Sequence, residues 1–314
     1  MKWLLKKLVI FLLTLLAISM LAFLAFQMIP GDPALSLLGT EATPERVEAL
    51  REKMGLNDPI ILQFGRWLLQ FVRGDMGTSY SYQMSVSEML KGKLMITLTL
   101  TGLSFVFILL LSIPIGIFGI KKGGLLNKCI GIVNQIIMAV PPFFGGILLT
   151  YFFGVVLRVF RPGGFVSYEQ DVISFFLYLL VPAMAIALPK AAMTIKFLQD
   201  SILKEMNQDY VRTALSRGNS QGQVLYYHIL KNAMIPVITF LAMALADIVA
   251  GSMIIEQVFS IPGIGRMLIA SISNRDYPVV QAIVVLMAFL VVLLNFLADI
   301  LYQKLDPRTG GKKI

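Results

Sequence analysis

The sequence has few of the residues that build soluble catalytic or metal-binding domains. Its 314 residues include one cysteine, Cys129, and one histidine, His228. A single cysteine cannot form an intrachain disulfide, and no Cys/His cluster could bind zinc. Charged residues make up only 14% of the chain, whereas they average about 25% in soluble domains. These absences exclude a disulfide scaffold, a zinc domain and an ordinary soluble domain, and we expect Cys129 to pack as a small apolar residue.

Nucleotide-binding and catalytic motifs are missing too. The tail sequence Gly310-Gly-Lys312-Lys contains the lysine of a P-loop. It lacks the upstream glycine spacing, the Ser/Thr and the strand-to-helix setting. No Ser/His/Asp arrangement and no metal-ligand spacing is present, and His228 lies in a polar stretch, where we expect a contact residue. We therefore predict that the chain is not an enzyme and holds no cofactor or metal.

The sequence is rich in long apolar runs. Hydrophobic residues make up 57% of it, and the mean hydropathy is +0.79. A hydrocarbon core about 30 Å thick is crossed by about 20 apolar residues in a helix. We predict an all-α polytopic membrane protein with six transmembrane helices, at Leu8–Met28, Leu94–Ile120, Cys129–Leu157, Val172–Ala192, Ala233–Ile255 and Val279–Tyr302. Pro141-Pro142 and Gly145-Gly146 predict a break inside the third.

The sequence between the first two spans, Pro30–Lys93, is predicted to be a sizeable extracytoplasmic segment. Its opening Pro30-Gly-Asp-Pro33 predicts a turn. Thr43 is a plausible N-cap for a helix with Pro44 in its first position, and Gly74–Ser79 is predicted to be a loop. We divide the chain into 1–93, the first span with this segment, and 94–314, the main transmembrane domain.

Basic residues are distributed unevenly between the predicted loops. The two short external turns hold only Arg158, Arg161, Arg266 and Arg275. The four predicted cytoplasmic segments hold Lys2, Lys6, Lys7, Lys121, Lys122, Lys128, Lys190, Lys196, Lys204, Arg212, Arg217, Lys231, Lys304, Arg308, Lys312 and Lys313. This is the positive-inside bias. It predicts cytoplasmic N- and C-termini and accounts for the net charge of +9 without a nucleic-acid partner.

The polar stretch Gln199–Pro236 is predicted to form short helices at the membrane surface. Asn207 is a reasonable N-cap, and Asp209 places an acidic group in the first turn, where the helix dipole favours it. Gly218 can take the left-handed conformation that ends a helix. Ser220–Gln223 reads as a capping box that starts the next helix. From these residues alone, an amphipathic surface helix without a partner remains an alternative.

This stretch resembles the "EAA" loop of permease subunits in bacterial binding-protein-dependent ABC importers. The matching residues are Arg212, Thr213, Ala214, Gly218 and Pro236. Arg212 replaces the leading Glu of the family. The sequence Asp209-Tyr-Val-Arg-Thr-Ala214, together with the long distance from Gly218 to Pro236, resembles the dipeptide, oligopeptide and nickel subgroup. Further matches are IPGDPA, TPERVEALREKMGLNDP, GRWLLQFVRGDMGTS, the run Glu256–Gly265, Arg275-Asp-Tyr-Pro278 and the tail Leu305-Asp-Pro-Arg308.

The resemblance implies a multi-pass permease subunit in the bacterial inner membrane that forms half of a translocation path for peptides. It also implies a second homologous permease, two ATPase subunits that bind ATP and Mg, and an extracytoplasmic substrate-binding protein. Within a coupling loop at about 199–231, it implies ATPase contacts by Asp209, Tyr210, Arg212, Ala214 and Gly218. For docking of the binding protein it points to the following external residues: Glu256, Pro262 and Gly263.

Two kinds of alternative stay open. Within the family, the substrate could be nickel or a metallophore. Outside it, the chain could be a channel or an exporter; a channel would need a filter-like loop or rings of charge, and neither is visible in the sequence.

Asp247 lies in the middle of the fifth predicted span, where ionisable groups are costly and usually face a cavity or a partner. One hypothesis is that it lines the path and meets a cationic group of the substrate, such as a peptide amino terminus. The alternative is a hydrogen bond to a neighbouring span or to the partner permease.

Overall fold

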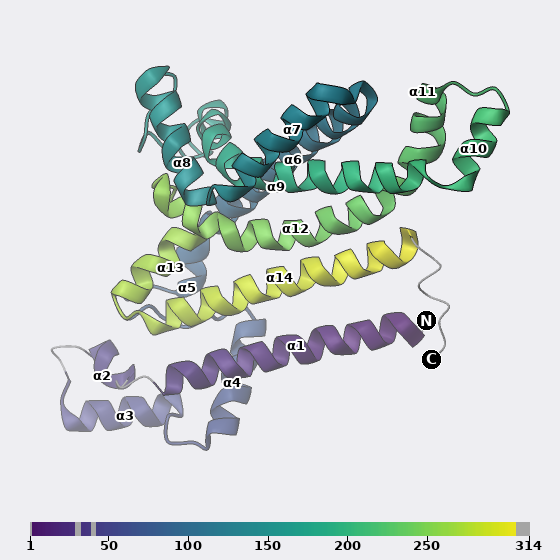
Figure 1. Ribbon diagram of the computed structural model, residues 1–314. Coiled ribbons are helices and arrows are strands. Elements are labelled where there is room, and N and C mark those ends of the chain that lie inside the picture. The colour runs from purple at the N-terminus through teal and green to yellow at the C-terminus, as the bar shows by residue number, and fades with distance from the viewer. Residues whose placement is uncertain (1, 29–32, 39–41, 306–314) are drawn as a thin grey trace. The chain divides into compact units, whose positions relative to one another are not determined.

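The computed structural model describes residues 2–28, 33–38 and 42–305. The predicted turn at residues 30–32 and the tail from residue 306 lie outside them. Those described residues form helices and no strand, and an isolated bridge pairs Thr78 with Ser85. The helices are α1 Lys2–Gln27, α2 Pro33–Leu38, α3 Pro44–Met54, α4 Ile60–Val72, α5 Val86–Leu90, α6 Lys93–Lys122, α7 Gly124–Ala139, α8 Pro142–Thr150, η2 Tyr151–Val156, α9 Val172–Met206, α10 Asp209–Ser216, α11 Gln221–Gln223, η3 Val224–Ile229, α12 Leu230–Val258, α13 Ile264–Ser273 and α14 Tyr277–Leu305 (Figure 1).

Within the described residues, five helices are long and apolar enough to cross a membrane, and the number of spans is six if a bent pair counts as one. The bent pair is the predicted third span: α7 ends at Ala139, and the helix restarts at Pro142 with an angle of 102°. The predicted break at Pro141-Pro142 is confirmed, because proline cannot continue the hydrogen-bond ladder of the preceding helix. The chain is therefore an all-α polytopic membrane protein.

The chain separates into two compact units, whose boundaries cross α6 and α14. Unit 1 comprises residues 1–96 and 262–292, and unit 2 comprises 97–261 and 293–314. The first boundary lies close to the predicted division at 93/94. Unit 1 also takes in α13 and most of α14, which sequence order alone did not suggest.

Unit 1 holds the predicted extracytoplasmic segment. The start of α3 is as predicted: the Thr43 hydroxyl accepts from the backbone N–H of Arg46 at 3.4 Å, and Pro44 fills the first position. Helix α4 was not predicted as a helix. Its Phe64 and Trp67 lie against Phe23 of α1, with ring centroids 5.6 and 5.7 Å from that ring. Burial of these rings holds α4 on α1.

A loop in unit 1 is fastened by a buried carboxylate. The Ser79 hydroxyl donates to Asp276, and the backbone N–H of Tyr80 donates to the Asp276 Oδ1 at 2.9 Å. Both Ser79 and Asp276 are fully buried. The loop Gly74–Ser79, predicted as a loop, is thereby tied to the turn between α13 and α14. Buried polar groups of this kind need such partners.

Unit 2 is built around α9, which contacts α7, α8 and α12. The Asp171 carboxylate caps its start by accepting from the backbone N–H groups of Ile173 and Ser174. Hydrogen bonds from the Ser174 side chain and from these amides lower the pKa of Asp171. Farther along, the Tyr178 hydroxyl donates to the carbonyl of Phe259 at 2.7 Å. This bond fixes the end of α12 against α9.

Two predicted spans are longer than expected. Helix α9 continues to Met206 and the helix containing α12 starts at Gln221, so much of the predicted surface stretch belongs to the spans. The physical reason is that polar Gln199 is buried and donates to the Asn127 Oδ1 at 3.0 Å. At about 1.5 Å per residue α9 is roughly 50 Å long, which exceeds the hydrocarbon core. Lys190, predicted to be cytoplasmic, lies near its middle.

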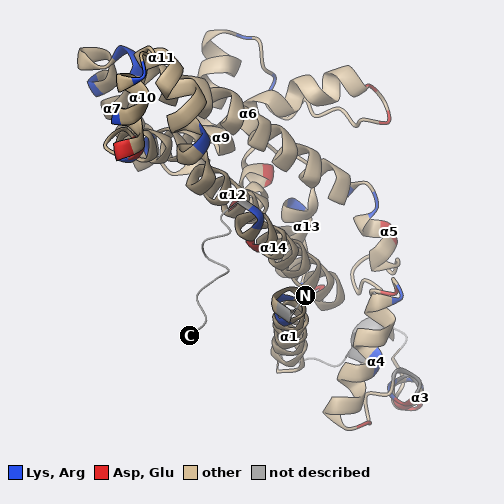
Figure 2. Ribbon diagram, turned by 90° about the vertical axis from the view of Figure 1, so that its right-hand side faces the viewer, with Lys and Arg blue, Asp and Glu red and all other residues tan. Residues whose placement is uncertain are grey.

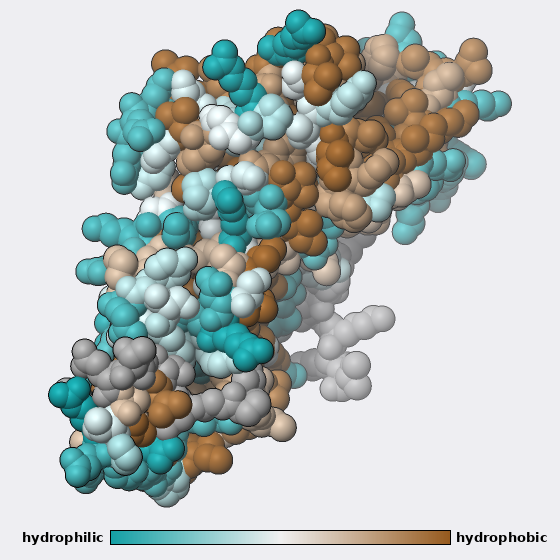
Figure 3. Space-filling model, turned by 90° about the vertical axis from the view of Figure 1, so that its left-hand side faces the viewer, coloured by the Kyte–Doolittle hydropathy of each residue, from teal (hydrophilic) through white to brown (hydrophobic). Residues whose placement is uncertain are grey.

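Apolar side chains remain widely exposed on the helices, as expected for surfaces that meet lipid or other subunits. The described surface in Figure 3 shows brown hydrophobic areas beside teal hydrophilic ones. Cys129 on α7 is also exposed. The prediction that it packs as a small apolar residue was therefore wrong, because this face of α7 has no neighbour within the described chain.

Candidate functional site

The coupling corner, defined here as residues Asn207–Ser220, lies at one end of unit 2, beyond the end of α9 (Figure 1). It consists of α10 and the turn that leads into α11. Figure 2 shows Lys and Arg positions grouped around α7, α10 and α11. The predicted coupling loop of 199–231 is thus reduced to a short projecting helix and its two turns.

One face of α10 is held by the chain itself. Val211 and Ala214 are buried, and α10 packs on η3. The Tyr210 hydroxyl donates to the Glu205 carboxylate at 2.7 Å, which ties α10 back to the end of α9. Burial, followed by this bond, raises the pKa of Tyr210. Ala214, expected to contact the ATPase, instead packs inside unit 2, because its position is on the apolar face of an amphipathic helix.

The opposite face of α10 is open. Asp209, Arg212 and Thr213 are exposed, and so is the apolar Leu215, at 42%. An acid, a base and an apolar side chain on one short helix form a surface suited to a protein groove. Of the five predicted coupling residues, the corner therefore presents Asp209 and Arg212 outward, while Tyr210 and Ala214 fix the helix.

Gly218 makes the turn as predicted. Its φ is +87°, a conformation that glycine adopts at no steric cost, and its N–H donates to the Leu215 carbonyl at 2.9 Å. The predicted capping box is confirmed in both directions between Ser220 and Gln223. The predicted N-cap was wrong: Asn207 ends α9, and its side chain donates to the Leu203 carbonyl at 3.2 Å.

Asp247 lies near the middle of α12 and pairs with Lys190 of α9. The Lys190 Nζ is 2.7 Å from the Asp247 Oδ2, and the two side chains are 25% and 66% exposed. The sequence had suggested either a path-lining group or a bond to a neighbouring span. The structure records the bond and also leaves the carboxylate open on one side.

The three residues predicted to dock a binding protein differ in exposure. Glu256 is fully buried and accepts a hydrogen bond from the Thr97 hydroxyl at 2.6 Å, so its side chain cannot touch a docking protein in this conformation. The Glu256 carboxylate joins α12 to α6 through this hydrogen bond and does not contribute to the surface. In unit 1, Gly263 is buried as the residue before α13, and Pro262 is partly exposed.

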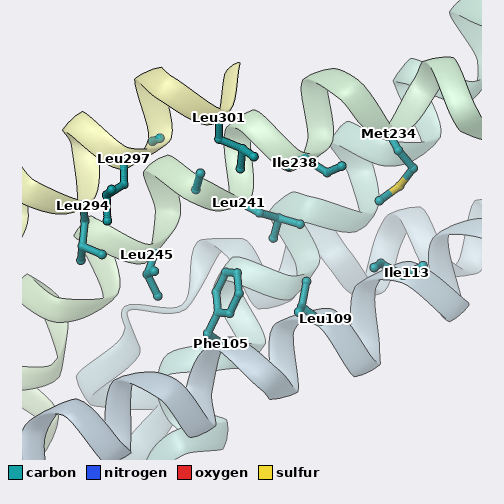
Figure 4. Close-up of a pocket in the computed structure, with 12 residues that line it drawn as sticks. Phe105, Leu109, Ile113, Met234, Ile238, Leu241, Leu245, Leu294, Leu297 and Leu301 are labelled. Carbon is teal, nitrogen blue, oxygen red and sulfur yellow. The ribbon is translucent and has the colours of Figure 1, made fainter. Parts of the chain in front are cut away.

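A cavity of about 350 Å³ lies between α6, α12 and the end of α14. Its lining side chains, which include Phe105, Leu109 and Leu241, are apolar throughout (Figure 4). A peptide backbone carries donors and acceptors that would lose their water there without replacement. The cavity is therefore a poor place for a peptide, and the polar pair on α9 and α12 is the better candidate.

Several residues at these sites gave little signal in the sequence. Lys190 was grouped with the cytoplasmic basic residues although it falls within the predicted span Val172–Ala192, and Thr97 and Asp276 were not singled out as partners of other groups. A lysine between two alanine-rich segments of a long helix could have drawn attention to Lys190. No group of three or more His, Cys, Asp or Glu among the described residues could hold a metal ion.

Comparison with known proteins covers almost the whole chain. Residues 108–311 match the family described as binding-protein-dependent transport system inner membrane component. Residues 1–101 match the N-terminal family of the same membrane components. The boundary between the two matches lies in α6, near the predicted division of the chain.

Individual relatives agree with the family match. The chain is 34% identical over 98% of both chains to a probable peptide ABC transporter permease protein of Sinorhizobium fredii. It is 36% identical over 94% of both to an oligopeptide transport system permease protein of Bacillus subtilis. It is 32% identical over 98% of both to a glutathione transport system permease protein of Salmonella paratyphi A. The chain therefore belongs to the inner membrane components of binding-protein-dependent transport systems, the permease subunits of ABC importers.

Proposed function

We propose that this permease imports peptides. It would form one half of the path, with a second homologous permease as the other half. Two ATPase subunits would bind ATP and Mg on the cytoplasmic side, and an extracytoplasmic binding protein would deliver the substrate. The relatives named for peptide, oligopeptide and glutathione transport support this substrate class.

The observation that carries the mechanism is the construction of the coupling corner. Its inner face is anchored by Val211, Ala214 and the Tyr210–Glu205 bond, so the helix is rigidly joined to α9 and η3. Its outer face, with Asp209 and Arg212, is available to a partner. A force applied by an ATPase to that face would therefore pass to α9 and α12 rather than being lost in a loose loop.

The function is tested by reconstituting the complete complex into liposomes with the binding protein outside and ATP inside. We expect uptake of labelled dipeptides or oligopeptides that stops without ATP or without the binding protein. Uptake of nickel alone, or of no peptide from a broad peptide mixture, would contradict the proposed substrate class.

The proposed orientation places both termini and the coupling corner in the cytoplasm. We expect a cysteine introduced at Ser81 to react with an impermeant thiol reagent from outside, and one at Ser216 to react only after the membrane is opened. Both positions are exposed, whereas Ser79 is buried and unsuitable. Because Cys129 is exposed, it is first replaced by serine. The reverse labelling pattern would overturn the orientation.

A further inference from the structure

The ion pair between Lys190 and Asp247 is unusual in its position. Each residue lies near the middle of a membrane-spanning helix, α9 or α12, so the pair lies far from either end of these helices. Ionisable groups are rare in membrane-spanning helices, and they face a partner or a water-filled cavity, because lipid cannot solvate them.

The pair is open on the outside of unit 2. The Asp247 side chain is 66% exposed, and Met243 and Ile254, which lie one and two turns away on α12, are 57% and 55% exposed. A methyl group added at Gly251 would meet nothing within 4 Å. This stripe of α12 therefore has free space in front of it that the rest of unit 2 does not fill.

The two ions also have bonding capacity to spare. An ammonium has three N–H donors, and a carboxylate has two acceptor oxygens. Among the described residues, the structure records one bond between them, from the Lys190 Nζ to the Asp247 Oδ2. Enclosing an ion pair removes both ions from water, and this cost is repaid only when further hydrogen bonds satisfy their remaining donors and acceptors. In the described part of the chain those further bonds are not recorded, and the Asp247 carboxylate is 66% exposed while the Lys190 side chain is 25% exposed.

We propose that Lys190 and Asp247 form a binding site for the charged ends of a peptide inside the translocation path. The inference rests on the proposed peptide uptake. Asp247 would take the amino-terminal ammonium and Lys190 the carboxylate. A peptide of two residues separates its ends by about 7 Å at most, so the internal pair opens as the peptide binds, and the flexible four-carbon stem of Lys190 permits this movement.

The chemistry of this exchange suits a path between membrane-spanning helices. A peptide with free ends carries the same two ions as the internal pair. When the peptide binds, the pair between Lys190 and Asp247 is replaced by two pairs, each between one of these side chains and one end of the peptide. When the peptide leaves, Lys190 and Asp247 pair with each other again. No charge is left without a counter-charge at any stage, so passage avoids the cost of an isolated ion among membrane-spanning helices. A solute without charged ends cannot compensate the opening of the pair.

The test compares uptake per purified complex in liposomes for the wild type and three variants: Lys190→Met, Asp247→Asn and the two together. Loss of a charged hydrogen bond to the peptide predicts a fall of at least about tenfold in each single variant, with no recovery in the double variant. Lys196→Met with Asp200→Asn is the matched control, because these residues form an exposed ion pair within α9 at 3.3 Å. Uptake by the control is expected to stay at the wild-type level.

A structural role gives a different pattern. Removing one partner of an ion pair leaves the other charge uncompensated and destabilises the protein, whereas removing both partners is often tolerated. If the pair only joined α9 to α12, the single variants would yield less complex and the double variant would recover both yield and uptake per complex. That recovery would overturn the proposed site while leaving peptide uptake by the wild type intact. Absence of ATP-dependent peptide uptake by the wild type would instead refute the proposed function.

Discussion

Replacement of Gly218 by proline is expected to abolish uptake while the complex still assembles and keeps its basal ATPase activity. Gly218 has φ +87° and donates its N–H to Leu215. Proline fixes φ near −65° and has no N–H, at a cost of about 3 kcal/mol. At about 1.4 kcal/mol per factor of ten, this cost lowers the ratio of correct to incorrect corner conformations about 100-fold. Uptake normalised to purified complex should fall by up to that factor.

Two further variants make this result interpretable. Gly218→Ala keeps the N–H and meets no neighbouring atom, so only the positive φ is penalised, by about 1 kcal/mol. It should give an intermediate loss. Gly222→Ala, in the next helix and also free of neighbours, should transport normally. Full uptake by both Gly218 variants would mean that the corner does not couple ATP hydrolysis to transport.

Replacement of Asp276 by alanine is expected to destabilise the loop of unit 1 that it fastens. The Asp276 side chain accepts from the Ser79 hydroxyl and from the Tyr80 N–H, and it is fully buried. Truncation removes the acceptor of the buried Ser79 hydroxyl and of the part-buried Tyr80 N–H, at a cost of about 1–3 kcal/mol in the free energy of unfolding for the buried donor. The purified protein in detergent should unfold at lower temperature, and protease should cleave near Tyr80 faster.

Asp276→Asn keeps one acceptor oxygen and should cost less. Asp75→Ala is the control, because Asp75 is exposed and accepts from the N–H of Gly77, two residues on in the same loop. An Asp276→Ala protein as stable and as protease-resistant as the Asp75→Ala protein would show that the buried carboxylate does not hold the loop.

The sequence predicted those parts of the fold that depend on local chemistry. The break at Pro141, the cap at Thr43 and the turn at Gly218 each follow from one or two residues and their backbone preferences. Long apolar runs gave the spans in the right order. The ends of the spans were less accurate, because a polar residue can continue a span when another helix satisfies it, as Asn127 does for Gln199.

Predictions about which way a side chain points were less successful, because they depend on contacts between distant segments. Ala214 and Glu256 were expected at surfaces and are buried. Lys190 falls within the predicted span Val172–Ala192 but was counted among the cytoplasmic basic residues, and it pairs with Asp247, 57 positions away. Such pairings depend on how helices pack, and no local pattern in one sequence records them.

The break at Pro141 also determines on which side of the membrane each later loop and the C-terminus lie. Helix α7 has 16 residues, about 24 Å at 1.5 Å per residue, too short to cross a core of about 30 Å. The chain reaches the opposite side of the membrane only if α8 and η2 cross the rest of the hydrocarbon core after the bend. If they do, the number of crossings is even and both termini share a compartment. If they turn back, the number is odd, and the coupling corner and the C-terminus move together to the opposite side. The bend at residues 139–142 therefore determines whether the chain crosses the membrane an even or an odd number of times.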